Sequence, residues 1–305
     1  MNITFRQLRL FLALAETGSV SAAARVMHVT QPTASMQLRE VTQAVGLPLY
    51  EVVSRRVHLT EAGLALARTA RAIATEWDVF EQRVAGAKGL TRGRLKVAVV
   101  STAKYFVPRL LGSFCKLHPH IDISLEVLNR DHVIDRLRSN QDDLYVMSMP
   151  PRDLPLEDQI VMPNPLVVIA PAAHPLAARK RTTLAQLQGE RFILREKGSG
   201  TRMATDAHLR RMAFVPGSVL ELGSNEAIKE SVEGQLGVSI LSRHALGPHP
   251  AGLSILNVQG FPIQSQWHLV WPKGKQLSPI AEVFREHLMA EAKEWSAGAG
   301  YRPNS

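Results

Sequence analysis

Residues 19–46, SVSAAARVMHVTQPTASMQLREVTQAVG, decide the fold of the N-terminal part of this chain. They predict two short helices, the first beginning near Ser21 and the second lying between Thr30 and Gly46. Thr30 is a good N-cap, Pro32 is tolerated in a first helical turn, and Gly46 suits the position after a helix end. An apolar stripe at spacings of four, three and four runs along the second helix: Ala34, Leu38, Val41 and Val45.

The other face of the second helix carries short polar side chains and has no acid before Glu40. Acids there would be repelled by phosphate, whereas amides and hydroxyls can bond base edges and an arginine can reach guanine or phosphate. The predicted DNA-binding residues of the two helices are Ser21, Thr30, Gln31, Pro32, Thr33, Ser35, Gln37 and Arg39. An ordinary amphipathic helix pair has the same periodicity, so this pattern alone leaves both interpretations open.

The flanking segments supply the rest of a small domain. Upstream, an apolar stripe that ends at Gly18 predicts a third helix, with Phe5, Leu8, Phe11, Leu12 and Ala15 on one face. Downstream, residues 47–60 alternate like strands around Ser54-Arg55-Arg56, which predicts a hairpin, or wing, with a basic tip. Arg55 and Arg56 are expected to contact the DNA backbone, and solvated loop charges are the alternative.

Residues 5–63 resemble the winged helix-turn-helix domain of LysR-type transcriptional regulators. The matching motifs FRQLRLFLALAETGSVSAAA, TQPTASMQL, GLPLY and HLTEAG occur in order and at matching spacing. The resemblance implies a DNA-binding regulator rather than an enzyme, with double-stranded DNA as a partner and RNA polymerase as a further candidate partner. One position departs from the family, because Val52 stands where an arginine is usual, and Arg55 and Arg56 are expected to supply the phosphate contact instead.

Residues 60–89 contain no proline and predict one long helix. Apolar residues recur along it at alternating steps of four and three, which is typical of a coiled-coil seam: Leu66, Ala70, Ile73, Trp77, Phe80 and Val84. We expect dimerisation through this seam, and the alternative is a helix that packs only on its own domain. The family resemblance also implies dimers through a linker helix, often paired into tetramers.

Composition limits the remaining classes of protein. The 305 residues carry a formal net charge of +9, which favours a polyanionic partner, although residues 1–60 contribute only +3. Cys115 is the single cysteine, so an intramolecular disulfide is excluded, and its apolar surroundings place it in the predicted core. We see no signal peptide and no apolar run of about 18 residues, so a cytoplasmic protein without a membrane partner is expected.

After residue 89 the chain alternates strands and helices, which predicts a doubly wound α/β architecture. The break at Pro163-Asn164-Pro165 suggests a second lobe. By resemblance these are two Rossmann-like lobes of the periplasmic-binding-protein type with a cleft for a small molecule. The expected domains are a winged helix-turn-helix (1–59), a linker helix (60–89) and an effector-binding domain (90–305). Lobe I takes residues 90–163 and 267–305, and lobe II takes residues 164–266.

Open α/β sheets bind ligands beyond the carboxyl ends of their strands, and helix N-termini with nearby hydroxyls attract anions. This rule selects four segments and predicts a small anionic effector. The predicted effector-binding residues are Ser101, Thr102, Lys104, Asn129, Arg130, Arg195, Ser199, Gly200, Thr201, Arg202 and Asn225. For any one segment, a plain cap or turn is the alternative.

Three stretches also resemble the CbbR-type branch of the family: STAKYFVPRLLGSFCKLHP, NRDHVIDRLRSNQDDLYVM and FILREKGSGTR. That resemblance implies control of a carbon-fixation operon and a phosphorylated sugar or nicotinamide dinucleotide phosphate as effector. It places Ser101, Thr102 and residues 199–202 in the effector cleft.

The alternative class is a solute-binding protein or a serine-type enzyme that carries a helix-turn-helix head. Ser101 and Lys104 match S-x-x-K, the nucleophile motif of serine β-lactamases, but the accompanying S-D-N and K-T-G are missing. Metal-binding spacing such as H-E-x-x-H is absent as well. We therefore expect no catalytic residue, no metal and no cofactor.

Overall fold

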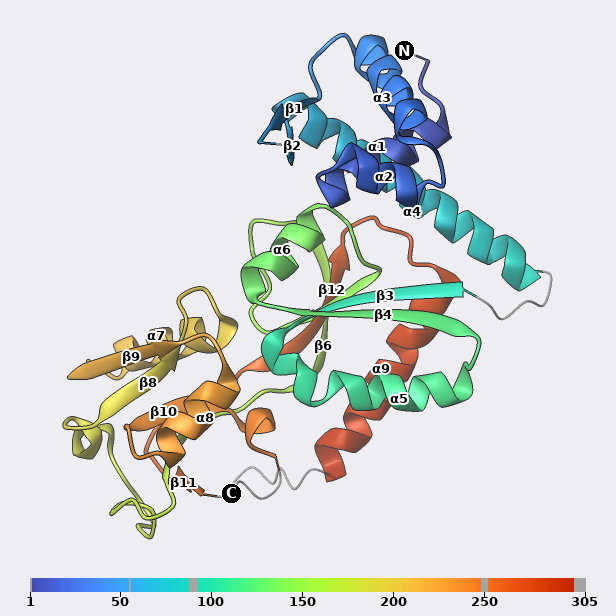
Figure 1. Cartoon of the computed structure of the whole chain (residues 1–305). Helices are drawn as coiled ribbons and strands as arrows, with labels where there is room; N and C mark the ends of the chain where they lie inside the picture. The colour runs from blue at the N-terminus through green and yellow to red at the C-terminus, as the bar shows by residue number, and fades with distance from the viewer. Residues whose placement is uncertain (1, 55, 88–92, 248–251, 299–305) are drawn as a thin grey trace. The chain divides into compact units, whose positions relative to one another are not determined.

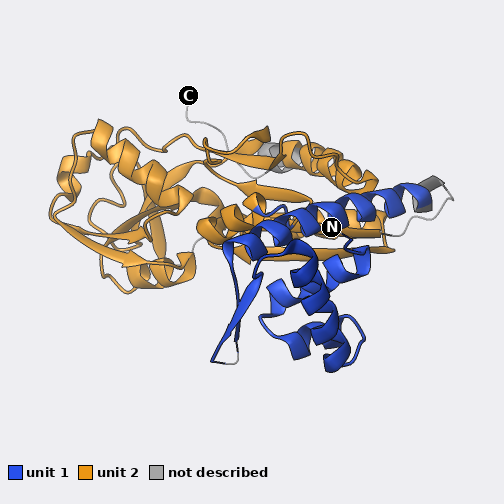
Figure 2. Cartoon of the chain, turned by 90° about the horizontal axis from the view of Figure 1, so that it is seen from above, with its two compact units in different colours: residues 1–90, 139–141 blue, residues 91–138, 142–305 orange. Residues whose placement is uncertain are grey.

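The computed structural model describes residues 2–54, 56–87, 93–247 and 252–298. The chain divides into two compact units, residues 1–90 with 139–141 and residues 91–138 with 142–305 (Figure 2). Each unit has a hydrophobic core of its own.

Three helices form the body of the first unit: α1 (Phe5–Thr17), α2 (Val20–Val26) and α3 (Gln31–Val45), shown in blue in Figure 1. The Thr30 side chain accepts a hydrogen bond from the Thr33 N–H and so begins α3. Gly46 ends α3 at a φ of 76°, a left-handed conformation that favours glycine, and Gly18 ends α1 in the same way. The predicted helix ends are therefore confirmed.

The wing is a two-stranded antiparallel hairpin of β1 (Tyr50–Val53) and β2 (Arg56–Leu59). Val53 pairs with Arg56, so the turn is tight and Arg56 begins the second strand with an exposed side chain. Arg55 lies outside the described residues. The predicted hairpin is confirmed.

The core of the first unit is made by residues that the apolar stripes single out. Its fully buried side chains include Leu10, Phe11, Leu14, Ala34, Leu38, Val41 and Leu49. Burying one leucine or phenylalanine side chain stabilises a fold by roughly 1.5–3 kcal/mol. The polar face of α3 points away from this core, because the opposite face of the helix packs into it.

The long helix α4 (Glu61–Ala87) begins where the Thr60 hydroxyl accepts from the Gly63 N–H at 3.1 Å. Ala70 is completely buried in the core of the first unit, so the expectation that it contacts a partner chain is wrong. This happens because the first half of α4 packs against α1. Further along the seam, Ile73, Trp77 and Phe80 are 43%, 46% and 55% exposed.

Lobe I of the second unit is a five-stranded sheet in the order β4-β3-β5-β12-β6. Its strands are β3 (Gly93–Val100), β4 (Ile121–Leu128), β5 (Leu144–Met147), β6 (Leu156–Pro163) and β12 (Gln266–Pro272). Its helices are η1 (Ser101–Tyr105), α5 (Val107–Leu117), α6 (Arg130–Arg138) and α9 (Pro279–Gly298). Strands β3, β4 and β5 are parallel, so their carboxyl ends lie at one edge of the sheet.

Lobe II is a second five-stranded sheet in the order β11-β7-β10-β8-β9. Its strands are β7 (Leu166–Pro171), β8 (Arg191–Arg195), β9 (Ser218–Leu222), β10 (Val238–Ser242) and β11 (Leu253–Leu256). Its helices are η2 (Leu184–Leu187), α7 (Gly200–Arg211), α8 (Asn225–Glu233) and η3 (Arg243–Leu246).

The chain crosses between the lobes twice, and the two crossing segments are hydrogen-bonded to each other. The Asn164 N–H donates to the Ser265 carbonyl at 2.8 Å, and Leu166 bridges to Ile263. The first crossing follows β6 and the second leads into β12, so the break at the proline pair marks a real change of lobe. The predicted α/β fold class is confirmed.

Two details differ from the sequence-based expectation. Strand β6 was not predicted, because it follows a proline-rich turn and its apolar residues are few, with Ile160 left 52% exposed. Cys115 is exposed rather than in the core, because the buried face of α5 is formed by Leu110, Leu111 and Phe114 instead.

Replacing Gly63 by alanine should destabilise the first unit. A Cβ there would lie 1.9 Å from the Leu49 carbonyl oxygen, so the backbone must shift. Overpacking of this kind costs about 1–3 kcal/mol. Thermal unfolding followed by circular dichroism should show a lower midpoint for Gly63→Ala. Gly112→Ala is the control, since its Cβ would meet nothing within 4 Å. Equal midpoints for the two variants would contradict the packing described.

Candidate functional site

The outward face of α3 presents the polar side chains that the sequence singles out. Gln31 Nε2 donates to Ser35 Oγ at 2.9 Å, and the Thr30 and Thr33 hydroxyls lie 2.8 Å apart. The other described residues predicted to bind DNA are exposed or half-buried: Ser21, Pro32, Gln37, Arg39 and Arg56. This face can therefore meet base edges and phosphates, and the individual contacts stay predictions.

Arg195, at the end of β8, is a buried cation with 3% of its surface exposed, and all of its N–H groups are hydrogen-bonded. Its Nη1 donates to Thr102 Oγ1 at 3.1 Å and to Asn225 Oδ1 at 2.8 Å. Its Nη2 donates to Ser101 Oγ at 3.1 Å. Ser101 and Thr102 follow β3 in lobe I, whereas Asn225 opens α8 in lobe II. One buried guanidinium thus links the two lobes.

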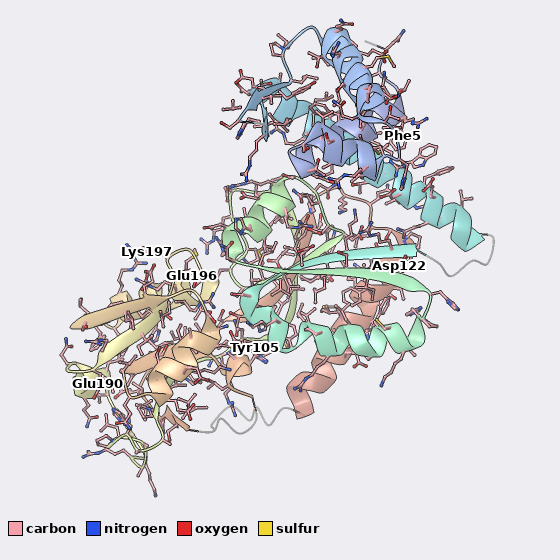
Figure 3. The ribbon with its side chains drawn as sticks, viewed as in Figure 1. Phe5, Tyr105, Asp122, Glu190, Glu196 and Lys197 are labelled. Carbon is pink, nitrogen blue, oxygen red and sulfur yellow. The ribbon has the colours of Figure 1, made fainter. Side chains whose placement is uncertain are left out.

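The remaining edge of this guanidinium is held by Glu196, which is labelled in Figure 3. Arg195 Nε donates to one carboxylate oxygen of Glu196 at 2.7 Å, and Nη2 donates to the other at 2.8 Å. A guanidinium has five N–H groups, so each donor of Arg195 has an acceptor. A buried charge is tolerated only when it is paired in this way.

The two lobe I hydroxyls are oriented by this network. Thr102 Oγ1 also accepts from Asn225 Nδ2 at 3.2 Å. Because the oxygens of Ser101 and Thr102 accept hydrogen bonds from cationic or amide N–H groups, their own hydroxyl hydrogens can be donated to a further acceptor. Oriented donors of this kind suit a carboxylate or phosphate.

A second link between the lobes surrounds Glu226, in the first turn of α8. Lys104 Nζ lies 3.0 Å from one carboxylate oxygen, and the Tyr105 hydroxyl donates to the other. Burial pushes the pKa of Glu226 upward, but hydrogen bonds from Tyr105, Lys104 and Ser224 outweigh it and hold that pKa at about 2. Burial and then the neighbouring Glu226 raise the pKa of the Tyr105 hydroxyl.

A third contact brings the start of α7 against the end of β5. A Cβ on Gly200 would lie 2.4 Å from Ser148 Oγ and 3.0 Å from the Ser148 carbonyl oxygen, so any larger residue there would force a neighbouring group to shift. Ser199 caps α7 by accepting from the Arg202 N–H at 3.1 Å. The first-turn N–H groups of α7, at Gly200 and Thr201, have no acceptor within the helix and can serve an anion.

Three predicted effector-binding residues have other partners. Asn129 caps α6 by accepting from the His132 N–H at 2.9 Å. Arg130 donates to the Met149 carbonyl, away from the Arg195 network. Arg202 bonds within lobe II, to Asp206 and Glu221. The structure brings together Ser101, Thr102, Arg195 and Asn225, with Lys104 beside them.

Sequence reasoning missed three participants: Tyr105, Ser148 and Glu196. It selected the segment that contains Glu226 but did not name that residue as a ligand-binding one. Ser148 directly follows β5, so the strand-end rule could have found it. Glu196 carried no signal, because neighbouring side chains of a strand normally point to opposite faces. Its bidentate bond with Arg195 exists because the chain turns where β8 ends.

The enzyme interpretation fits this arrangement poorly. Ser101 accepts from Arg195, and the Lys104 ammonium is paired with Glu226, whereas a serine nucleophile needs a base at its hydroxyl. Within the described ranges, no group of three or more His, Cys, Asp or Glu side chains is placed to hold a metal ion. In the same ranges, no helix combines the length and apolarity needed to cross a bilayer.

Comparisons with known proteins agree with both parts of the chain. Residues 5–64 match the family described as "Bacterial regulatory helix-turn-helix protein, lysR family", and residues 88–293 match "LysR substrate binding domain". The fold and the two matches define a transcriptional regulator in which a DNA-binding head is joined to a two-lobed domain, and not an enzyme. The chain belongs to the LysR family.

Individual relatives support the finer resemblance. The chain is 43% identical to the HTH-type transcriptional activator CmpR of Synechocystis sp., over 95% of this chain and 96% of the relative. It is 40% identical to the RuBisCO operon transcriptional regulator of Acidithiobacillus ferrooxidans, over 97% of each. The solved regulatory domain of Synechocystis PCC6803 CcmR in complex with 2-PG is 46% identical and superposes with a TM-score of 0.63, covering 66% of this chain and 98% of that one. The predicted resemblance to regulators of carbon-fixation operons is confirmed.

Glu226→Gln should remove an acid-dependent part of the stability. The folded-state pKa of Glu226, about 2, lies below its ordinary value of 4.5. The charged group therefore stabilises the fold above about pH 4.5, and this contribution is lost as the pH falls towards 2. Urea unfolding at pH 7 should show a less stable variant, and the difference from the unsubstituted protein should shrink at pH 3.

Glu230→Gln, on the exposed side of the same helix, is the matched control for that measurement. It should leave the pH dependence unchanged. A Glu226→Gln variant with the same stability difference at both pH values would contradict the role assigned to Glu226.

Proposed function

We propose that this regulator binds a small phosphorylated anion at the Arg195 network and that binding of the anion changes its affinity for promoter DNA. The observation that carries the proposal is the buried Arg195, whose donors are shared between hydroxyls of lobe I and the Asn225 amide of lobe II. A ligand that binds between these groups favours the arrangement of the lobes that brings them together. Such a ligand shifts the conformational equilibrium only by its difference in affinity for the two arrangements.

The chemistry of the site supports an anion with two acidic groups. The hydroxyls of Ser101 and Thr102 have hydrogens to donate, and the first turn of α7 offers free N–H groups at Gly200 and Thr201. Glu196 already neutralises one edge of Arg195, so uncharged donors must supply much of the binding. The related CcmR regulatory domain was solved with 2-PG, which we take as 2-phosphoglycolate. That ligand class agrees with the donors present here.

The DNA-binding part of the proposal rests on the head and on α4. The exposed Ile73, Trp77 and Phe80 form an apolar strip that a second copy of α4 would cover. The rings of Phe5 and Trp77 lie 5.5 Å apart and extend this strip onto α1. Dimers then place two α3 helices on inverted half-sites, about one turn of DNA or a multiple of it apart.

Further assembly follows from the same arrangement. Paired dimers would give a tetramer, and a promoter-bound regulator lies within reach of RNA polymerase. The protein then acts in the cytoplasm, where its promoter is. By analogy with the RuBisCO operon regulator, the target is an operon for carbon fixation.

The experiment combines ligand binding with DNA binding on the full chain. A ligand at about 100 times its Kd adds roughly 2.7 kcal/mol to the apparent stability, so 2-phosphoglycolate should raise the midpoint of thermal unfolding. Ser101→Ala and Thr102→Val should each weaken binding by roughly tenfold or more, because a hydrogen bond to a charged group is worth about 1.5–3 kcal/mol. The same ligand should change the affinity for a DNA fragment from the region upstream of the regulator's own gene, measured by fluorescence anisotropy.

Ser231→Ala is the matched control, because this serine is on α8 but its hydroxyl donates to the Ala227 carbonyl of its own helix. It should bind the ligand as the unsubstituted protein does. Stabilisation by 2-phosphoglycolate that survives both Ser101→Ala and Thr102→Val would place the ligand elsewhere. An absence of stabilisation and of any effect on DNA affinity would overturn the proposal.

A further inference from the structure

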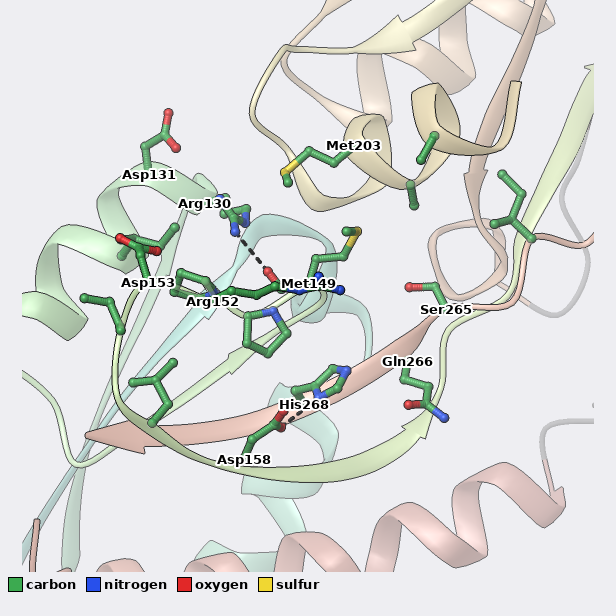
Figure 4. A pocket seen from close by; sticks show the side chains of 18 of the residues that line it. Arg130, Asp131, Met149, Arg152, Asp153, Asp158, Met203, Ser265, Gln266 and His268 are labelled. Atoms are coloured by element: carbon green, nitrogen blue, oxygen red, sulfur yellow. Dashed lines mark hydrogen bonds and ion pairs between the residues drawn. The ribbon is translucent and has the colours of Figure 1, made fainter. Parts of the chain in front are cut away.

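A large groove lies on lobe I and lobe II outside the Arg195 network. It has a volume of about 1790 Å³ and is lined by α6, by the loop that follows β5, by α7 and by the segment that leads into β12 (Figure 4). Ser101, Thr102, Arg195 and Asn225 are not among its lining residues. Pockets for small ligands are commonly about 300–1,000 Å³, so this groove has room for a larger molecule.

The groove contains a half-buried arginine, Arg130, with one unused donor. Arg130 Nη2 donates to the Met149 carbonyl at 2.9 Å, a bond drawn dashed in Figure 4. Its Nε is buried and has no hydrogen-bond partner among the described residues. Burial also lowers the pKa of Arg130, as expected for a cation short of acceptors. A buried N–H without an acceptor costs free energy, and an anion entering the groove would supply the acceptor.

Other charges of the groove divide into paired and unpaired groups. Arg138 is bonded to Asp153 at 3.0 Å, and His268 is bonded to Asp158 at 2.7 Å. The groups outside these two pairs are four arginines and two acids: Arg130, Arg152, Arg210, Arg211, Asp131 and Asp135. Positive charge is therefore in excess.

Two of these arginines are free to bind a ligand. The side chains of Arg152 and Arg210 make no hydrogen bond or ion pair with any residue that the structure describes. Arg152 is in the loop after β5, in lobe I, whereas Arg210 is near the end of α7, in lobe II. A ligand that reached both would hold an anionic group at each end. The lining of the groove also includes apolar side chains, among them Met149, Met203 and Ile263.

We propose that this groove is a second ligand site, which takes an elongated organic dianion with an apolar middle. One anionic end meets Arg130 and Arg152, and the other meets Arg210. The ligand would span from α6 of lobe I to α7 of lobe II and would add a second metabolic input to the lobe arrangement. Two ligands that favour the same arrangement bind cooperatively, because their coupling is reciprocal.

The test uses α,ω-dicarboxylates of increasing chain length as probes, with octanoate as the monoanionic control, in isothermal titration calorimetry on the full chain. Dicarboxylates should bind more tightly than octanoate, with an optimum length. Arg152→Ala and Arg210→Ala should each weaken the binding of the best dicarboxylate by roughly tenfold or more, because each removes a charged hydrogen-bond donor. These variants avoid Arg130, whose bond to Met149 supports the local fold.

Arg179→Ala, at an exposed loop position of lobe II, is the matched control and should bind like the unsubstituted protein. Ser101→Ala separates this site from the Arg195 network, since it should weaken dicarboxylate binding much less than Arg152→Ala or Arg210→Ala does. A larger loss of binding in Ser101→Ala than in these two arginine variants would assign the probe to the Arg195 network instead. Dicarboxylates that bind no better than octanoate, or that bind equally well to Arg152→Ala and Arg210→Ala, would overturn the second site.

Discussion

The arrangement of the two lobes depends on satisfying one buried guanidinium. Arg195 is almost fully enclosed, so water cannot supply acceptors for its N–H groups. Ser101 and Thr102 of lobe I provide two of them, and Asn225 and Glu196 of lobe II provide the others. Separating the lobes would break the first two bonds, and a buried charged donor without its partner is costly. The lobes are therefore coupled by hydrogen-bonding groups to which an anion can also bind.

This coupling gives the two-lobed domain a physical basis for responding to a metabolite. The Arg195 network, the Glu226 cluster and the close approach of Gly200 to Ser148 all join lobe I to lobe II. Each lies at the carboxyl end of a strand or at the first turn of a helix, where backbone N–H groups are unpaired. A small change in the groups that meet there changes the balance between lobe arrangements. The DNA-binding head does not need to change its internal arrangement in this way, and its core consists of aliphatic and aromatic side chains.

The sequence predicts local features best. The cap at Thr30, the left-handed glycines at the helix ends and the apolar stripe of α3 are confirmed because each depends on residues within a few positions of one another. The effector site is predicted only in part. Asn129 and Arg202 are near strand ends, as the rule requires, yet their side chains find partners within their own lobe.

Tertiary packing decides the rest. Tyr105 enters the site because two segments that are distant in the sequence meet, which no local pattern records. Glu196 enters it because the chain turns where β8 ends. Ala70 fits the coiled-coil spacing but is buried, because α4 packs against α1 in this region. The first part of this face of α4 belongs to the core of the first unit, and only its later residues are exposed. The sequence does not predict strand β6 because its apolar pattern is weak. The strand forms nevertheless, because it pairs with β12.

Amide hydrogen exchange of an Arg195→Met variant measures the central claim most directly. If the guanidinium links the lobes, residues 101–105 of lobe I and the first turn of α8 in lobe II should both exchange faster than in the unsubstituted protein. Faster exchange confined to β8 and its neighbours in lobe II, with residues 101–105 unchanged, would contradict the claim.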